Sequence, residues 1–274
     1  MSGHFGRRAE WLRAGHAAAH PYVGYGEGPP LVVLPGVNDP LLRAREQAWF
    51  DALLVAYCRR QARACAAAGA PRTVYYLSRP PGVPEGIGAM ADGYRDALDA
   101  FGPCDVLGVS MGGFAALALA RRDERVRSVA LGLSAAWLSR HGRESLATWD
   151  RWAREGEWRR VYRAGVRAVA TGPARTAGGL FARVFDRVRI PPDRDFRRTI
   201  AATLAFDATP WLGKLDVPAL VVGGTRDPFF TDGAFAAAAR GLDACHERLD
   251  GWGHDAMVTT GRVDAAVARH LAGR

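Results

Sequence analysis

A serine flanked by glycines is the feature of this sequence with the clearest chemical meaning. Residues 108–113 read Gly-Val-Ser-Met-Gly-Gly, so Ser110 stands in a G-x-S-x-G pattern. The residues before it, Val106 and Leu107, are typical of a strand, and the alanine- and leucine-rich segment 114–120 is typical of a helix. Glycines leave room for a tight strand-to-helix turn that exposes the hydroxyl, and the helix N-terminus favours developing negative charge. Ser110 is therefore the candidate nucleophile.

A serine hydroxyl is a weak nucleophile until a base takes its proton, so a histidine must reach it. Of the seven histidines, His254 lies in the glycine-containing loop 250–255, between the last predicted strand and the last predicted helix. A loop that follows a strand lies at the carboxyl edge of a parallel sheet, where functional groups gather. We expect His254 to be the general base. For the other six a structural role is expected: His4, His16, His20, His141, His246 and His270.

The base needs a carboxylate to fix its tautomer and to stabilise the imidazolium ion. Asp227 follows the predicted strand 217–222 in the segment Gly-Gly-Thr-Arg-Asp-Pro, again at the carboxyl edge. We expect Asp227 to be this acid. Asp232, with capping of the next helix as its other role, and Asp255, beside the base, are weaker candidates.

An oxyanion hole would complete a site for acyl transfer. The backbone N–H of Met111, the residue after the nucleophile, is one expected donor. The second is the N–H of Val37, in the loop that follows the predicted strand 30–34. Asn38 and Asp39 in the same loop are candidates for substrate contact, or equally for the turn and the start of a helix.

Apolar runs alternate with helical stretches along most of the chain, which indicates an α/β fold with a mostly parallel sheet and helices on both faces. We expect strands at residues 30–34, 73–77, 105–109, 126–133, 217–222 and 245–249. Helices are expected at residues 41–68, 87–100, 111–121, 232–240 and 256–271. The cluster Gly24-x-Gly26-x-Gly28 precedes a strand, whereas a dinucleotide fingerprint follows one, so we interpret it as a turn.

Residues 134–213 break this alternation, because the segment is helical in character and contains no convincing strand. We expect it to form a helical cap above a core made of residues 1–133 and 214–274. Five of the eight tryptophans fall within it, and it holds 15 arginines against 8 acidic residues. The tryptophans suggest an apolar acyl or aryl pocket, with Trp137, and Trp252 beside the base, as possible substrate contacts. The arginines either steer an anionic substrate or solvate an outer face, and we favour the face.

Composition excludes several other classes of protein. The net charge is +9, but Lys214 is the single lysine among 37 basic residues, which reflects codon usage in a GC-rich genome more than a nucleic-acid surface. No apolar run approaches the roughly 20 residues of a membrane span, and no apolar segment follows Arg7-Arg8 as in a signal peptide, so a cytoplasmic protein is expected. The four scattered cysteines and the absence of H-E-x-x-H give no sign of a metal or cofactor.

These motifs together resemble the α/β-hydrolase family, in the branch with a helical cap between the sixth and seventh strands. The likeness rests on residues 26–36, 108–113, 224–227 and 253–254. Two departures are visible: Pro35-Gly36 replaces the frequent His-Gly, and residues 78–82 replace an Asp-x-x-Gly-x-Gly stretch. The family implies the triad order Ser–Asp–His.

The expected activity is that of a carboxylesterase-like serine hydrolase, which cleaves esters of small apolar substrates through an acyl-enzyme. The same fold and triad also support carbon–carbon bond hydrolysis, lactone opening or a lyase step. A third possibility is a non-catalytic ligand receptor that retains the triad. The sequence does not identify the substrate.

Overall fold

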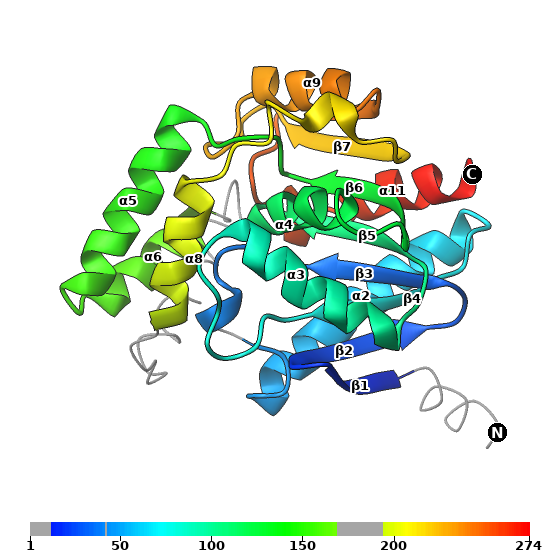
Figure 1. The fold of residues 1–274 in the computed structure, drawn as a ribbon, viewed down its shortest axis with the longest axis horizontal. Coiled ribbons are helices and arrows are strands. Elements are labelled where there is room, and N and C mark those ends of the chain that lie inside the picture. Colours follow the sequence, from blue (N-terminus) through cyan, green and yellow to red (C-terminus); the bar gives the residue numbers. More distant parts are fainter. Residues whose placement is uncertain (1–11, 42, 169–193) are drawn as a thin grey trace.

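The central feature of the fold is a mostly parallel eight-stranded sheet (Figure 1). The computed structural model describes residues 12–41, 43–168 and 194–274. The order of the strands across the sheet is β1-β2-β4-β3-β5-β6-β7-β8. Strand β2 runs antiparallel to β1 and β4, and all other neighbours are parallel. The strands are β1 (Leu12–Ala17), β2 (His20–Gly26), β3 (Pro30–Leu34), β4 (Thr73–Leu77), β5 (Cys104–Val109), β6 (Val126–Gly132), β7 (Ala219–Gly224) and β8 (Cys245–Leu249).

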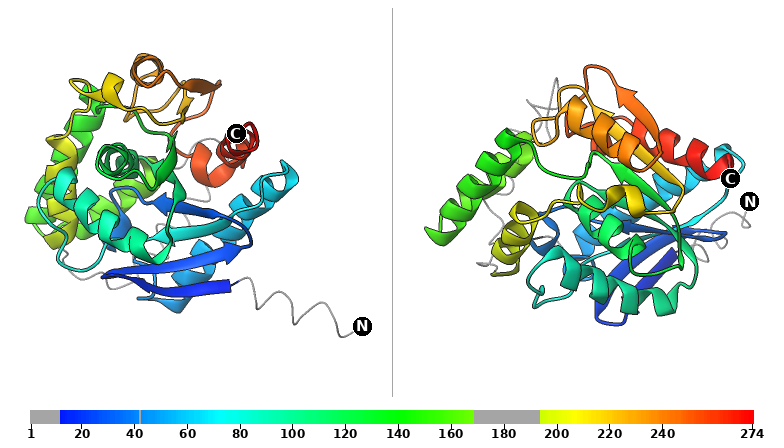
Figure 2. Two further views of the ribbon diagram at one scale, coloured as in Figure 1. Left: turned by 45° about the vertical axis from the view of Figure 1, so that its right-hand side comes forward. Right: turned by 45° about the horizontal axis from the view of Figure 1, so that its top comes forward.

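Both faces of the sheet are buried because its central strands are apolar on both sides. In β3, Val32 and Leu34 belong to one core cluster and Leu31 and Val33 to the other, as the two-residue period of a strand requires. Helices α3 (Ile87–Ala97), α4 (Met111–Ala120) and α9 (Asp232–Gly241) pack on the first face. Helices α2 (Ala48–Ala67) and α11 (Arg262–Ala272) pack on the second (Figure 2). The predicted α/β fold is therefore correct.

Among the described residues, three helices between β6 and β7 lie beyond the carboxyl ends of the strands (Figure 1). They are α5 (Arg140–Arg154), α6 (Trp158–Ala168) and α8 (Arg194–Leu204), and they fall in the segment 134–213 that was predicted to form a cap. Residues 169–193 of that segment lie outside the described residues. Short helical turns occur at η1 (Asp39–Leu41), η2 (Leu98–Ala100) and η3 (Leu212–Lys214).

The helix predicted at residues 41–68 begins later than expected, at Ala48. The residues before it are held by other segments: the Ala44 N–H donates to Ser78 Oγ at 3.0 Å, and the Arg45 N–H donates to Asp51 Oδ1 at 2.6 Å. Arg45 also has a φ of 71°, which no helix accommodates. Local propensity favoured a helix here, but these hydrogen bonds keep the segment in a loop.

The helix predicted at residues 256–271 is broken in two. A short helix α10 (Ala256–Thr259) is followed by Gly261 with a φ of 64°, and α11 begins at the next residue. Strand β7 likewise begins at Ala219 and not at residue 217. Pro218 has no N–H to donate, so it joins the neighbouring strand only through its carbonyl, which accepts from the Val129 N–H at 3.0 Å.

The hairpin formed by β1 and β2 was missed by the sequence analysis. Strand β1 is an edge strand with mostly exposed side chains, and β2 contains two glycines, so neither shows a strong apolar pattern. The interpretation of the glycine cluster as a turn is therefore wrong for Gly24 and Gly26. A Cβ at Gly24 would stand 2.7 Å from a ring carbon of Tyr75 and 2.9 Å from the Val74 oxygen, so the glycine lets β2 pair closely with β4.

Candidate active site

Ser110 lies on the turn between β5 and α4, where its backbone is strained. Its φ is 53°, in the left-handed region that a non-glycine residue rarely adopts. A Cβ at Gly108 would collide with the backbone of Gly113, and one at Gly112 with the backbone of Leu34. These contacts explain why the G-x-S-x-G pattern folds as a tight turn that holds Ser110 at the carboxyl edge of the sheet.

His254 and Asp227 lie next to Ser110 in a continuous chain of hydrogen bonds. His254 Nε2 is 3.0 Å from Ser110 Oγ, and His254 Nδ1 is 2.7 Å from Asp227 Oδ2. Asp227 comes from the loop after β7 and His254 from the loop after β8, so neighbouring parallel strands deliver both residues to one edge. The structure thus brings together the three side chains that the sequence analysis selected.

The carboxylate of Asp227 is fixed by its own backbone surroundings. Its second oxygen, Oδ1, accepts hydrogen bonds from the N–H groups of Phe229 at 2.8 Å and Phe230 at 3.1 Å. The ring of Phe229 packs edge-on to the His254 imidazole, with centroids 4.8 Å apart. Asp227 and His254 are both buried. The alternative acid, Asp232, lies in the first turn of α9 and pairs with Arg248 at 3.1 Å, away from the base.

The loop after β3 lies against the nucleophile. A Cβ at Gly36 would be 3.3 Å from Ser110 Cβ, which places residues 35–37 beside the Ser110 side chain. Met111 is the first residue of α4, where backbone N–H groups have no partner within the helix. Val37 and Met111, the two residues predicted to donate to an oxyanion, both line the cavity above Ser110.

That cavity has a volume of about 220 Å³, and apolar side chains form most of its wall. Ser110 and His254 line it together with residues from loops at the carboxyl edge of the sheet, from α5, α6 and α8, and from α2 and α10. The apolar wall is made of Val37, Phe50, Tyr76, Val109, Met111, Leu138, Leu146, Trp149, Phe229, Phe230 and Met257. Asn38, Asp39 and Thr203 supply polar groups.

Only one of the three predicted substrate contacts lines the cavity. Asn38 lines the cavity, whereas Trp137 and Trp252 do not, and Trp149 of α5 stands there instead. Trp137 is half-buried against the main core, and Trp252 packs against the opposite one. Helix α5 has a strongly amphipathic pattern that buries Leu146 and Trp149 on one face, and this spacing is the signal that could have identified Trp149.

The cysteines stand outside the cavity wall. Cys58, Cys65 and Cys104 are buried, and burial raises the pKa of the Cys58 and Cys104 thiols to about 12, far from a reactive thiolate. Among the described residues, no group of three His, Cys, Asp or Glu side chains is arranged to hold a metal ion.

Within the same residues, no helix is long and apolar enough to cross a bilayer.

Comparison with known sequences gives a partial match. No protein-family model matches the chain. The pimeloyl-[acyl-carrier protein] methyl ester esterases of two strains of Neisseria meningitidis serogroup B are 33% identical to it over 151 residues. That match covers 53% of this chain and 58% of each relative, so it extends over little more than half the length of those enzymes.

Solved structures match nearly the whole chain. The enol-lactonase from Burkholderia xenovorans LB400 is similar with a TM-score of 0.73 and 18% identity, over 96% of this chain and 100% of the other. An α/β hydrolase from a Medee basin deep-sea metagenome library gives 0.72 and 13%, over 96% and 98%. A meta-cleavage product hydrolase from Pseudomonas fluorescens IP01 gives 0.70 and 17%, over 97% and 99%. The chain therefore has the α/β-hydrolase fold.

Proposed function

We propose that this protein is a serine hydrolase that cleaves carboxylic esters through an acyl-enzyme formed on Ser110. One observation carries the proposal: an unbroken hydrogen-bond relay, Asp227–His254–Ser110, ends at the base of an apolar cavity. Such a relay activates a hydroxyl for attack on a carbonyl carbon.

In the acylation half-reaction, Ser110 Oγ attacks the ester carbon while His254 Nε2 accepts the hydroxyl proton. The Asp227 carboxylate accepts a hydrogen bond from His254 Nδ1–H, whose proton stays on the ring, and it stabilises the imidazolium ion that forms. His254 then donates its proton to the departing alcohol oxygen, which leaves an acyl group on Ser110. A water molecule activated by His254 attacks this ester in the second half-reaction, and Ser110 regains its proton as the acid leaves.

The carbonyl oxygen becomes negative in each tetrahedral intermediate, so fixed donors must face it. The N–H groups of Val37 and Met111 are the proposed donors, since both residues line the cavity next to Ser110. The N-terminus of α4 adds a favourable field at the same point.

The proposed substrates are small esters with an apolar acyl group of moderate length. The support is the apolar wall of the cavity and its volume of about 220 Å³. The Neisseria relatives are named as esterases of pimeloyl-[acyl-carrier protein] methyl ester, and hydrolysis of a carboxylic ester agrees with the reaction proposed here. Residues 134–213 would act as a cap that decides which esters enter. A cytoplasmic location stays a prediction.

The direct test measures hydrolysis of p-nitrophenyl esters by the wild type and by Ser110→Ala. We expect the variant to lose turnover by about 10⁴-fold or more while its melting temperature is retained, because a methyl group occupies the same turn but cannot attack. A fluorophosphonate probe should label the wild type at Ser110. An active Ser110→Ala protein, or labelling at another residue, would overturn the proposal.

The fold alone does not separate ester hydrolysis from related reactions, since its structural matches include an enol-lactonase and a meta-cleavage product hydrolase. Assays of a lactone and of a vinylogous diketone beside the esters distinguish them. Efficient carbon–carbon cleavage with little esterase activity would favour the alternative reaction. Tight ligand binding without turnover would indicate a receptor.

A further inference from the structure

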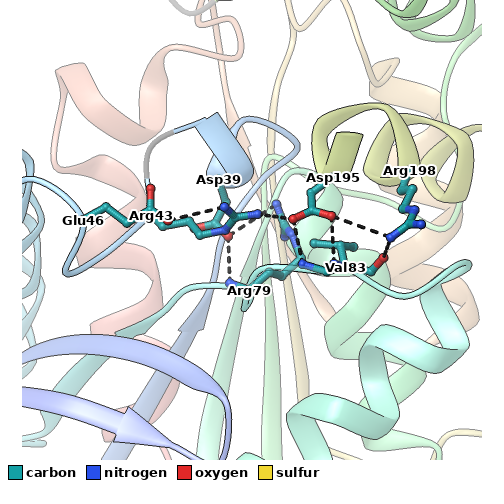
Figure 3. Close-up of polar contacts among 8 residues, drawn as sticks. Asp39, Arg43, Glu46, Arg79, Val83, Asp195 and Arg198 are labelled. Carbon is teal, nitrogen blue, oxygen red and sulfur yellow. Dashed lines mark hydrogen bonds and ion pairs between the residues drawn. The ribbon is translucent and has the colours of Figure 1, made fainter. Parts of the chain in front are cut away.

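Arg79 is a fully buried arginine, 1% exposed, whose guanidinium group is attached to the loop beside the nucleophile. Nη1 donates to the Pro35 carbonyl oxygen at 3.0 Å, and Nη2 donates to the Gly36 carbonyl oxygen at 2.6 Å. The Arg79 backbone N–H donates to Asp39 Oδ2 at 2.8 Å, and this oxygen is 3.7 Å from Nη2 (Figure 3). One residue thus holds residues 35–39 at three points.

The bond to Gly36 has a consequence for the adjacent amide. The carbonyl of Gly36 and the N–H of Val37 belong to the same peptide group, which is planar and trans, so the two bonds point in opposite directions. A cation on the carbonyl side therefore fixes the orientation of the N–H on the other side. It also polarises the amide, because a hydrogen bond accepted by a carbonyl strengthens the N–H as a donor.

We infer that Arg79 is a positioning residue for the oxyanion hole, which orients and polarises the peptide that presents the Val37 N–H to the carbonyl oxygen of the ester. This inference rests on the proposed function, since it assigns Arg79 a part in the same acyl transfer. Arg79 does not touch the substrate, because Arg79 is absent from the cavity wall. It acts through the residue 36–37 peptide.

The segment that carries Arg79 is itself held in place by α8. Asp195 accepts hydrogen bonds from the backbone N–H groups of Gly82 at 2.9 Å and Val83 at 3.0 Å, and it pairs with Arg43 at 2.5 Å (Figure 3). Arg43, Val83 and Asp195 are buried, whereas Gly82 lies at the surface. Transition-state binding requires the peptide to stay within a few tenths of an ångström of its position. The Arg79 guanidinium can ensure this only if the Arg79 backbone is itself fixed, and the bonds to Asp195 fix the segment that carries it.

The experiment compares Arg79→Lys and Arg79→Gln with matched variants of Arg72. Arg72 has the same kinds of partner, since Nε donates to Asp105 Oδ2 at 2.9 Å and Nη1 donates to the carbonyl oxygens of Ala70 and Pro71. It stands before the amino end of β4, at the edge of the sheet opposite the site. Arg72→Lys and Arg72→Gln therefore report the cost of losing a structural arginine without touching the oxyanion loop.

We expect Arg79→Gln to lower kcat by up to about 10²-fold, the lower end of the cost of removing one oxyanion donor, with KM changed by less than about threefold. Arg79→Lys keeps the charge but not the two-pronged geometry, so kcat should fall by about tenfold. The inhibition constant of a trifluoromethyl ketone, which forms a tetrahedral adduct on Ser110, should rise by the same factor as kcat/KM falls. Rates are expressed per site titrated with fluorophosphonate, so partial misfolding does not imitate the effect.

Arg79 variants with wild-type kcat per titrated site would overturn the inference and leave the proposed function intact. So would an equal loss of kcat in the Arg72 variants, or a loss of kcat without weaker binding of the ketone. Failure of the proposed function has a different signature, in which the wild type shows no ester hydrolysis or Ser110→Ala retains it.

Discussion

Asp227 Oδ2 lies 2.7 Å from His254 Nδ1, on the side of the imidazole ring opposite Ser110. Because Asp227 Oδ1 is already bonded to two backbone N–H groups, the carboxylate cannot rotate without losing them. It therefore favours a ring with its proton on Nδ1 and its lone pair on Nε2, directed at the serine hydroxyl. The orientation of the acid thus sets which ring nitrogen can accept the serine proton.

Asp227→Asn should reduce kcat severely, by about 10⁴-fold as in a serine protease with the equivalent change. The Asn oxygen would keep the two backbone bonds, which leaves its NH₂ group facing His254. An NH₂ donor there favours the tautomer protonated on Nε2, and that tautomer cannot take the proton from Ser110. The measurement is kcat on a p-nitrophenyl ester together with the melting temperature, which should change little.

Asp232→Asn is the matched control for this change. Asp232 pairs with Arg248 on the exposed side of α9, so its loss should leave kcat within about twofold of the wild type. Near-normal activity in Asp227→Asn, or a large loss in Asp232→Asn, would transfer the role of the acid to another residue.

Much of the candidate site could be predicted from the sequence because each member lies in a local pattern at the end of a strand. Ser110 stands in a glycine-bounded turn, and Asp227 and His254 each follow an apolar strand. Parallel strands place all three loops at one edge, so the alternation of strands and helices was enough to predict that they meet. Their hydrogen-bond distances required the structure.

The cavity wall and the Arg79 contacts could not be predicted in this way. They join segments that are far apart in the chain, such as Asp39, Arg79 and Asp195, through side chains whose directions depend on the packing of helices outside the sheet. The same limit explains why Trp137 and Trp252 were chosen over Trp149. Composition indicated an aromatic cap, but which ring faces the cavity depends on how α5 is seated.

Salt should have little effect on activity if the arginines of α5 and α6 form a solvated outer face. Several of them pair with acidic neighbours on the same helix or its start, as Arg140 does with Glu144, Arg154 with Asp150 and Arg160 with Glu157. The paired carboxylates offset the positive electric field of these arginines, and exposed charges are screened beyond about 10 Å at 0.1 M salt. We expect kcat/KM for a neutral ester to vary by less than about twofold between about 0.05 and 0.5 M NaCl.

An ester of equal length that carries a carboxylate is the comparison substrate. Its kcat/KM should follow the same shallow dependence on salt. A steep fall for the anionic ester alone would show that the arginines attract anionic substrates, and the interpretation as a solvated face would then be wrong.

Acid should destabilise the fold partly through His20. Burial against Tyr94, with a smaller contribution from the Arg79 charge, lowers the pKa of His20 to about 4 from an ordinary value of 6.5. Between these two values the unfolded chain binds a proton that the folded chain does not, so the free energy of unfolding falls as pH falls through this window. The loss assigned to His20 between about pH 7 and about pH 5 is about 2 kcal/mol.

His20→Gln should remove this contribution, so its urea unfolding free energy should depend less on pH than that of the wild type. The exposed His16, in the same hairpin, supplies the control, and His16→Gln should keep the wild-type dependence. An identical pH dependence in His20→Gln and the wild type would show that protonation of His20 is not coupled to unfolding.

The acyl preference should follow the shape of the cavity. Trp149 of α5 and Gly165 of α6 both line it, and a Cβ at Gly165 would approach the Asn38 side-chain amide at 3.3 Å. Trp149→Ala should shift the optimum of an ester chain-length series toward longer acyl groups, because it removes a large ring from the wall. Gly165→Val should shift the optimum toward shorter groups, because it adds bulk. The wild type should prefer acyl chains of moderate length over acetyl. Each methylene of the acyl chain that is buried against the apolar wall adds about 0.8 kcal/mol to the binding free energy.

The control for Trp149→Ala is Trp158→Phe in the neighbouring helix α6. The Trp158 ring packs on Phe196 and is absent from the cavity wall. It should lower stability without moving the chain-length optimum. The readout is kcat/KM for each ester, normalised to the best substrate of each variant, so that a general loss of activity cancels. An unchanged optimum in both Trp149→Ala and Gly165→Val, or a wild-type preference for acetyl esters, would show that this cavity does not bind the acyl group.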